Sequence, residues 1–323
     1  MSSDRVLLEV RNLTVDYVGE HSVARAVNGI NFDIREGEAF GLAGESGCGK
    51  STVAFAIARL TRLPGLVSGG QVRMGGEDVL KFDKARLKAY RWREVSFVFQ
   101  SAMNALNPVI TVAEQIMDVI ETHEPELGSR GARDRAAELF ELVGIPPKRL
   151  DDYPHQFSGG MRQRICIAIA LALKPKLIIM DEPTTALDVV VQRDIIEQIV
   201  ELKARLGFSV LFITHDLGLM IEFCDRIGVM YSGELVEVAP ATSILTNPRH
   251  PYTQALGNSF PPLTGPRIRL EGIAGSPPDL RALPEGCRFA PRCAYTTDVC
   301  RTTAPLKRYS PEHSSEAACH LLN

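Results

Sequence analysis

The stretch from Gly44 to Thr52, with the sequence GESGCGKST, has the residue types and the spacing that suit phosphate binding. It fits the pattern G-x-x-x-x-G-K-[ST] at every fixed position. Glycines let successive backbone N–H groups turn inward around phosphate oxygens, and a helix that starts there adds partial positive charge. We expect Lys50 to reach the β and γ phosphates of a nucleotide and Ser51 to hold Mg²⁺ through its hydroxyl. The predicted nucleotide contacts are Gly44, Ser46, Gly47, Cys48, Gly49, Lys50, Ser51 and Thr52.

The segments on either side of this stretch predict the elements that would position it. An apolar run over residues 39–43 indicates a strand before it, and the pattern over 52–60 indicates a helix after it. An ordinary glycine-rich turn is the alternative, but such a turn would not need a strand before it and a helix after it. Tyr17 ends an earlier predicted strand, over residues 7–17, and could stack on an adenine ring or simply be an exposed tyrosine.

A second set of polar residues follows other predicted strands. Asp181 and Glu182 follow the apolar run 177–180, Gln100 follows the run 95–99, and His215 follows the run 209–214. A solvated loop is the alternative for the two carboxylates, but an unpaired carboxylate at the end of a buried strand is costly. Strands and helices that alternate, with chemistry at the carboxyl ends of the strands, predict a doubly wound α/β plan.

The composition of the whole chain narrows the class of protein. The 323 residues include 36 Lys and Arg against 39 Asp and Glu, which argues against a nucleic-acid protein that works by bulk charge. The first ten residues lack the apolar region of a signal peptide, and the longest apolar run, over residues 165–173, is about half the length of a membrane span. We therefore expect a cytoplasmic chain whose role at a membrane, if it has one, depends on partner chains.

Taken together, these motifs resemble the ATPase subunit of an ATP-binding cassette (ABC) transporter. The resemblance implies a P-loop NTPase fold of the ABC type over residues 1–256, with a mixed core sheet, an antiparallel β subdomain and a helical subdomain at about 101–170. It implies ATP and Mg²⁺ as cofactors, with Asp181, Gln100 and Ser51 on the metal ion. Glu182 then matches the general base for ATP hydrolysis, and His215 matches the histidine that contacts the γ phosphate.

The resemblance also implies that the active site is shared between subunits. Ser158, Gly159 and Gly160 match the family segment that contacts ATP bound to the opposite subunit, and Ser158 is expected to cap the helix that follows. Met161 replaces the commoner glutamine of this segment. The resemblance further implies that residues 185–188 cross the dimer interface, and that the loop after Gln100 touches the membrane subunit, although residues 101–103 depart from the pattern frequent in peptide importers.

A narrower resemblance is to the D-type cassette of oligopeptide and dipeptide importers, and it rests on residues 106–108, 158–164, 250–253, 275–280 and 283–287. It implies a heterodimer with a related cassette, two transmembrane permease subunits, an extracellular solute-binding protein and a place at the cytoplasmic face of the membrane. Nickel, glutathione and oligosaccharide importers are alternatives. A soluble cassette ATPase that acts on DNA or ribosomes is a rival, but the sequence lacks the long insertions or the second cassette typical of those proteins.

Residues 257–323 predict a separate C-terminal extension, with a linker rich in glycine and proline followed by four cysteines. Disulfides are unexpected in a cytoplasmic chain, and the closely spaced pairs of most zinc sites are absent. The looser spacing suits a [4Fe–4S] cluster, and the family resemblance points the same way. Zinc and unligated thiols are the alternatives. The predicted ligands are Cys287, Cys293, Cys300 and Cys319.

Overall fold

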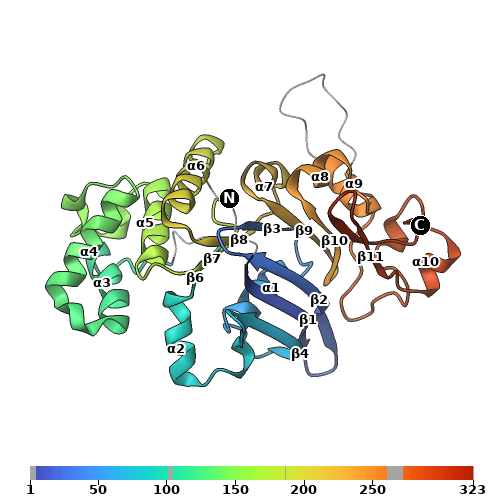
Figure 1. The fold of residues 1–323 in the computed structure, drawn as a ribbon, viewed down its shortest axis with the longest axis horizontal. Coiled ribbons are helices and arrows are strands. Elements are labelled where there is room, and N and C mark those ends of the chain that lie inside the picture. The colour runs from blue at the N-terminus through green and yellow to red at the C-terminus, as the bar shows by residue number, and fades with distance from the viewer. Residues whose placement is uncertain (1–4, 101–104, 186, 260–271, 323) are drawn as a thin grey trace. The chain divides into compact units, whose positions relative to one another are not determined.

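The computed structural model describes residues 5–100, 105–185, 187–259 and 272–322, which form two compact units (Figure 1). The first unit consists mainly of Lys81–Leu211 together with Arg35–Glu38. The second combines Val6–Ile34, Ala39–Leu80 and Phe212–Asn323. None of the helices in the described part of the chain is long and apolar enough to cross a membrane.

An antiparallel sheet in the second unit has the strand order β2-β1-β4-β5. The two predicted N-terminal strands are confirmed, and a residue facing the core alternates with a more exposed one along much of each. The turn between β4 and β5 contains Gly75 and Gly76, whereas Gly69 and Gly70 lie inside β4. The strands are β1 (Val6–Val18), β2 (Val23–Arg35), β4 (Gly65–Met74) and β5 (Glu77–Asp78).

The remaining strands of the second unit lie in the order β11-β12-β10-β9-β3. β3 and β9 are parallel and all but one of their residues are buried, as expected of central strands. β9, β10 and β12 pair antiparallel, and β9 and β10 form a hairpin. The strands are β3 (Ala39–Ala43), β9 (Arg226–Tyr231), β10 (Glu234–Pro240), β11 (Lys307–Ser310) and β12 (Ser315–Ala318).

Among the residues that the structure describes, five helices belong to the second unit. The longest, α1 and α9, each have eight residues and begin at a glycine and a histidine cap respectively. The helices are α1 (Lys50–Ile57), α7 (Leu217–Phe223), α8 (Ala241–Thr246), α9 (Pro251–Asn258) and α10 (Asp298–Thr302). A single 3₁₀ turn, Ala290–Arg292, lies between the first two C-terminal cysteines in the sequence.

Strands of the first unit, as far as the structure describes it, follow the order β8-β7-β6, where β7 and β6 are paired in parallel and only the first three residues of β8 belong to this unit. Every residue of β7 is buried. The apolar runs of the sequence therefore predicted these strands to within a residue or two at each end. They are β6 (Val95–Val98), β7 (Leu177–Asp181) and β8 (Ser209–Ile213).

The first unit also contains several helices. α3 begins with a capping box in which Thr111 and Glu114 satisfy each other's backbone N–H groups. α3, α4 and α5 pack against one another, and α5 also contacts α6. The helices are α2 (Lys84–Arg93), α3 (Val112–His123), α4 (Gly128–Leu142), α5 (Gly159–Leu171) and α6 (Val189–Leu206).

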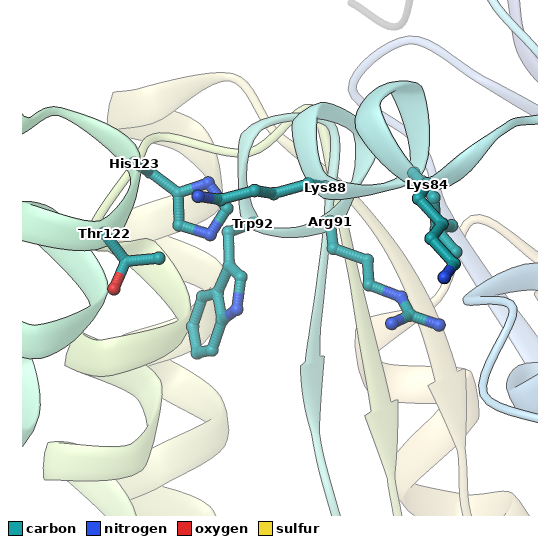
Figure 2. Close-up of a pocket in the computed structure, with 7 residues that line it drawn as sticks. Lys84, Lys88, Arg91, Trp92, Thr122 and His123 are labelled. Atoms are coloured by element: carbon teal, nitrogen blue, oxygen red, sulfur yellow. The ribbon is translucent and has the colours of Figure 1, made fainter.

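The last turn of α2 is kinked and borders a cavity of about 340 Å³. Trp92 has φ 72°, a left-handed conformation that is costly for a bulky residue. Figure 2 shows its indole and the Arg91 side chain extending in the same direction from α2. Burial lowers the pKa of His123 on the opposite wall, and the charges of Lys88 and Arg93 act in the same direction. The cavity is lined by Lys84, Leu87, Lys88, Arg91, Trp92, Thr122 and His123.

Candidate active site

The phosphate loop, residues 44–49, lies between β3 and α1, as predicted. Gly49 occupies the N-cap of α1 with φ 107°, and a Cβ atom there would lie 2.3 Å from the carbonyl oxygen of Ala26. A Cβ atom on Gly44 would lie equally close, 2.3 Å, to the Met230 oxygen. Only glycine fits either position. Because no described side chain caps α1, the first N–H groups of the helix can accept an anion.

Lys50 is the first residue of α1 and is only 6% exposed. Its Nζ donates to the carbonyl oxygens of Gly44 at 2.7 Å and Glu45 at 3.0 Å, so the ammonium group is held by the backbone of the loop itself. A buried cation beside inward-facing N–H groups is the arrangement that binds phosphate.

Tyr17 lies near the C-terminal end of β1, where it pairs with Gly65 of β4. Its hydroxyl is 3.4 Å from the hydroxyl of Thr52 in α1. The structure therefore brings Tyr17 to the helix that follows the phosphate loop. Stacking of its ring on adenine stays a prediction.

Gln100 and Glu182 meet in the first unit. The Gln100 Nε2 donates to Glu182 Oε2 at 2.7 Å, and the Thr185 hydroxyl donates to the same oxygen at 3.1 Å. Asp181, the last residue of β7, is 3% exposed. Glu182 itself has φ 46°, a strained conformation that turns the chain sharply as β7 ends. The structure thus brings Gln100 and Glu182 into contact, and Thr185 is a partner of Glu182 that the sequence reasoning missed.

Ser158 caps α5, as predicted, because its Oγ accepts the Met161 N–H at 3.3 Å. A Cβ atom on Gly160 would lie 2.6 Å from Val191 Cγ1, so this glycine permits α5 and α6 to approach closely. Asp188 caps α6 in the same manner, accepting from Val191 N at 2.9 Å. Of the loop predicted to cross a dimer interface, Ala186 lies outside the described residues.

The predicted site residues therefore form two groups, one in each unit. His215 follows β8, is exposed, and belongs to the unit that holds the phosphate loop. The loop segment 101–103, which the sequence connected with the membrane subunit, lies outside the described residues. The other unit holds Gln100, Asp181, Glu182, Ser158, Gly159 and Gly160.

The four C-terminal cysteines line one small cavity in the second unit, beside residues that include His250, Phe289 and His320. Burial raises the pKa of the Cys287 thiol to about 11 and also raises the pKa of Cys293 and Cys319. The Cys300 sulfur lies 3.2 Å from the Thr297 hydroxyl.

The predicted iron–sulfur cluster, with zinc as its alternative, is wrong. In the part of the chain that the structure describes, no group of three or more His, Cys, Asp or Glu side chains is arranged to hold a metal ion. The cysteines line a small cavity, and their spacing in the sequence could not show whether they are metal ligands or packing residues.

Comparison with known proteins agrees with the fold and the phosphate loop. The family model described as "ABC transporter" matches residues 27–185, and the one described as "Oligopeptide/dipeptide transporter, C-terminal region" matches residues 236–300. The probable peptide ABC transporter ATP-binding protein y4tR of Sinorhizobium fredii is 45% identical over 97% of this chain and 94% of that protein. The dipeptide transport ATP-binding protein DppD of Haemophilus influenzae is 43% identical over 97% of this chain and 95% of DppD.

A solved structure gives the same result at the level of the fold. The ATP-binding cassette MJ0796, solved as a dimer bound to ADP and Pi, superimposes with a TM-score of 0.65 at 29% identity, covering 73% of this chain and 99% of that one. The mixed α/β fold, the phosphate loop and the relatives agree, and the chain belongs to the family of ABC transporter ATPases that carry the oligopeptide/dipeptide transporter C-terminal region.

Proposed function

We propose that this chain binds and hydrolyses ATP to power a membrane importer of dipeptides or oligopeptides. The observation that carries this proposal is the match of residues 236–300 to the oligopeptide/dipeptide transporter C-terminal region, in a chain that resembles peptide-transport ATP-binding proteins over nearly its full length. The phosphate loop, with its buried lysine, supports nucleotide binding.

Each predicted site residue has a separate role in this proposal. Lys50 and the N-terminus of α1 bind the phosphates. Ser51, Gln100 and Asp181 offer a hydroxyl, an amide and a carboxylate, an oxygen donor set that fits Mg²⁺, which would neutralise phosphate charge when bound. Glu182 accepts the proton of the attacking water, while Gln100 and Thr185 fix the orientation of its carboxylate. His215 contacts the γ phosphate.

The assembly proposed for this function contains several chains. We place the cassette at the cytoplasmic face of the membrane, held by two permease subunits and supplied by an extracellular solute-binding protein. Ser158, Gly159 and Gly160 complete the ATP site of a second, related cassette. A heterodimer predicts that this chain and its partner together hydrolyse ATP faster than the sum of their separate rates. Full activity of this chain alone would contradict the heterodimer.

Reconstitution in proteoliposomes tests the function. The chain, its partner cassette, the permeases encoded beside them and the binding protein are assembled, and ATP hydrolysis is measured with dipeptides, longer peptides, nickel, glutathione or oligosaccharides. Stimulation by peptides is the expected result. Stimulation by one of the other solutes alone would overturn the peptide assignment, and absence of ATP hydrolysis in every arm would overturn the ATPase.

A further inference from the structure

The phosphate loop contacts a residue 247 positions further along the chain. Arg292 Nη1 donates to both carboxylate oxygens of Glu45, at 3.1 and 3.0 Å. The same guanidinium binds the backbone oxygens of Ala274 at 2.9 Å and Ile273 at 3.2 Å. The Arg292 side chain is only 5% exposed, and its hydrogen bonds connect the phosphate loop to the C-terminal region. Charge-assisted hydrogen bonds of this kind are stronger than neutral ones.

Aromatic side chains hold the same part of the loop from another direction. The Tyr252 hydroxyl accepts the Glu45 N–H at 2.9 Å, and Tyr252 is fully buried. Its ring packs on Tyr231 and on Phe289, with centroid separations of 4.6 and 5.3 Å. Backbone and side chain of Glu45 are therefore both fixed by residues from outside the loop.

A second arginine of the C-terminal region contacts the turn at Ser232 and Gly233, and this turn in turn contacts the phosphate loop. Arg288 pairs with Glu234 at 3.1 Å and donates to the Ser232 carbonyl oxygen. The next residue, Gly233, donates its N–H to the Cys48 oxygen of the phosphate loop at 2.9 Å. Arg288 and Arg292 thus support opposite ends of one loop from a single short segment.

We propose that the segment 288–292 positions the phosphate loop, so that nucleotide affinity depends on the C-terminal region as well as on the loop's own glycines. This inference rests on the proposed function, because it concerns the same ATP site. In the family match, the C-terminal region marks the type of transporter, whereas here it also shapes the site that binds ATP. Arg292 is the principal positioning residue, and Tyr252 and Arg288 support it.

Titration with a fluorescent ATP analogue, MANT-ATP, measures how nucleotide affinity depends on these residues. Arg292→Ala should weaken binding roughly tenfold, within the usual range of coupling between sites. Glu45→Gln should weaken it in the same direction, and Arg292→Lys should fall between Arg292→Ala and the wild type, since lysine keeps the charge but loses the fork of donors. The double variant Glu45→Gln, Arg292→Ala should also bind MANT-ATP more weakly than the wild type. The factor by which its Kd rises should be smaller than the product of the factors for the two single variants.

Arg281→Ala is the matched control. Arg281 lies in the same C-terminal region, but its partner Asp279 is two residues away and the pair is exposed. This variant should bind MANT-ATP like the wild type.

The outcomes separate the inference from the function on which it rests. If the wild type fails to bind MANT-ATP, the proposed function fails. If it binds and Arg292→Lys and Glu45→Gln keep the wild-type Kd, the positioning role is overturned. A purely structural role would lower the Tm of these variants while leaving the Kd, measured well below Tm, unchanged. Should Arg292→Ala not fold, the two milder variants still decide the question.

Discussion

At the scale of single residues, Glu182 combines a strained backbone with a fixed carboxylate. Its φ of 46° is kept although non-glycine residues disfavour it, and two side-chain donors meet at one of its oxygens. A residue that is held in a costly conformation by its neighbours fits a group whose orientation matters for chemistry.

Replacing the carboxylate tests that role. Glu182→Gln should lower kcat for ATP hydrolysis by roughly 10² to 10⁴, the usual contribution of a general base, while nucleotide affinity is kept. Glu201→Gln, an exposed position on α6, is the control and should leave kcat unchanged. Near-normal hydrolysis by Glu182→Gln would show that another group accepts the proton.

Lys50 gives a second prediction at this scale. Lys50→Ala removes the ammonium group that bonds to Gly44 and Glu45, so the loop loses both a cation for phosphate and its own internal contacts. MANT-ATP binding should fall below detection at concentrations that saturate the wild type. Lys148→Ala, an exposed lysine, serves as the control. Retained binding by Lys50→Ala would contradict the assignment of the phosphate site.

His250 predicts a pH dependence of stability. Burial lowers its pKa from 6.5 to about 4, and its Nδ1 accepts the Tyr252 N–H, which requires the neutral ring. Because the unfolded chain binds the proton more readily, the contribution of the neutral ring is fully present above pH 6.5 and is lost as the pH falls toward 4. The free energy of unfolding should fall over this range by roughly 3 kcal/mol.

The variant His250→Asn isolates this contribution. Asparagine can still cap α9 but does not titrate. Burial raises the pKa of the neighbouring Glu237, whose carboxylate accepts the backbone N–H of residue 250, and this group is common to both proteins. Denaturant unfolding at several pH values between 7 and 4 should therefore show a smaller decrease in the free energy of unfolding for the variant than for the wild type. Parallel curves would exclude His250 as the cause.

At the scale of elements, the approach of α5 to α6 depends on Gly160. A methyl group there would lie 2.6 Å from Val191 Cγ1, and a β-branched valine on a helix has little freedom to move away. Gly160→Ala should lower the free energy of unfolding by roughly 1 to 3 kcal/mol, the usual cost of overpacking.

A second glycine provides the comparison. Gly257 lies in α9, and a Cβ atom there would have no atom within 4 Å. Gly257→Ala should therefore be neutral or stabilising, because alanine loses less backbone entropy on folding. Denaturant unfolding measures the free energy of unfolding of both variants. Equal changes in the two variants would refute the packing argument for Gly160.

Most elements were predictable from the sequence because their signals are local. Buried strands such as β3 and β7 are short apolar runs, and the N-terminal ends of α5 and α6 coincide with capping side chains. The exceptions arise where tertiary contacts override a local rule. Adjacent glycines usually mark a turn, but Gly70, which follows Gly69, lies inside β4, where a side chain would collide with the backbone of β1 at Asn12. The kink at Trp92 has no signal in the sequence.

At the scale of the whole molecule, the nucleotide site was predictable only in part. The fixed positions of the phosphate loop and the carboxylates after β7 follow from motif spacing. Arg292, Tyr252 and Thr185 do not, because their roles arise from contacts that the fold creates. The cysteines show the opposite error. Their spacing correctly suggested proximity, but the described side chains around the cavity are not arranged to hold a metal ion.

The antiparallel pairing of β12 with β10 has a further consequence for shortened forms of the protein. Glu237 and Val238 of β10 pair with Ala317 and Glu316, and the four-residue β11, with the exposed Arg308, lies outermost. Removal of residues 307–323 would uncover the hydrogen-bonding edge of β10, to which a strand of another molecule could add. We therefore expect β12 to prevent self-association by covering this edge. A chain truncated at residue 306 should aggregate.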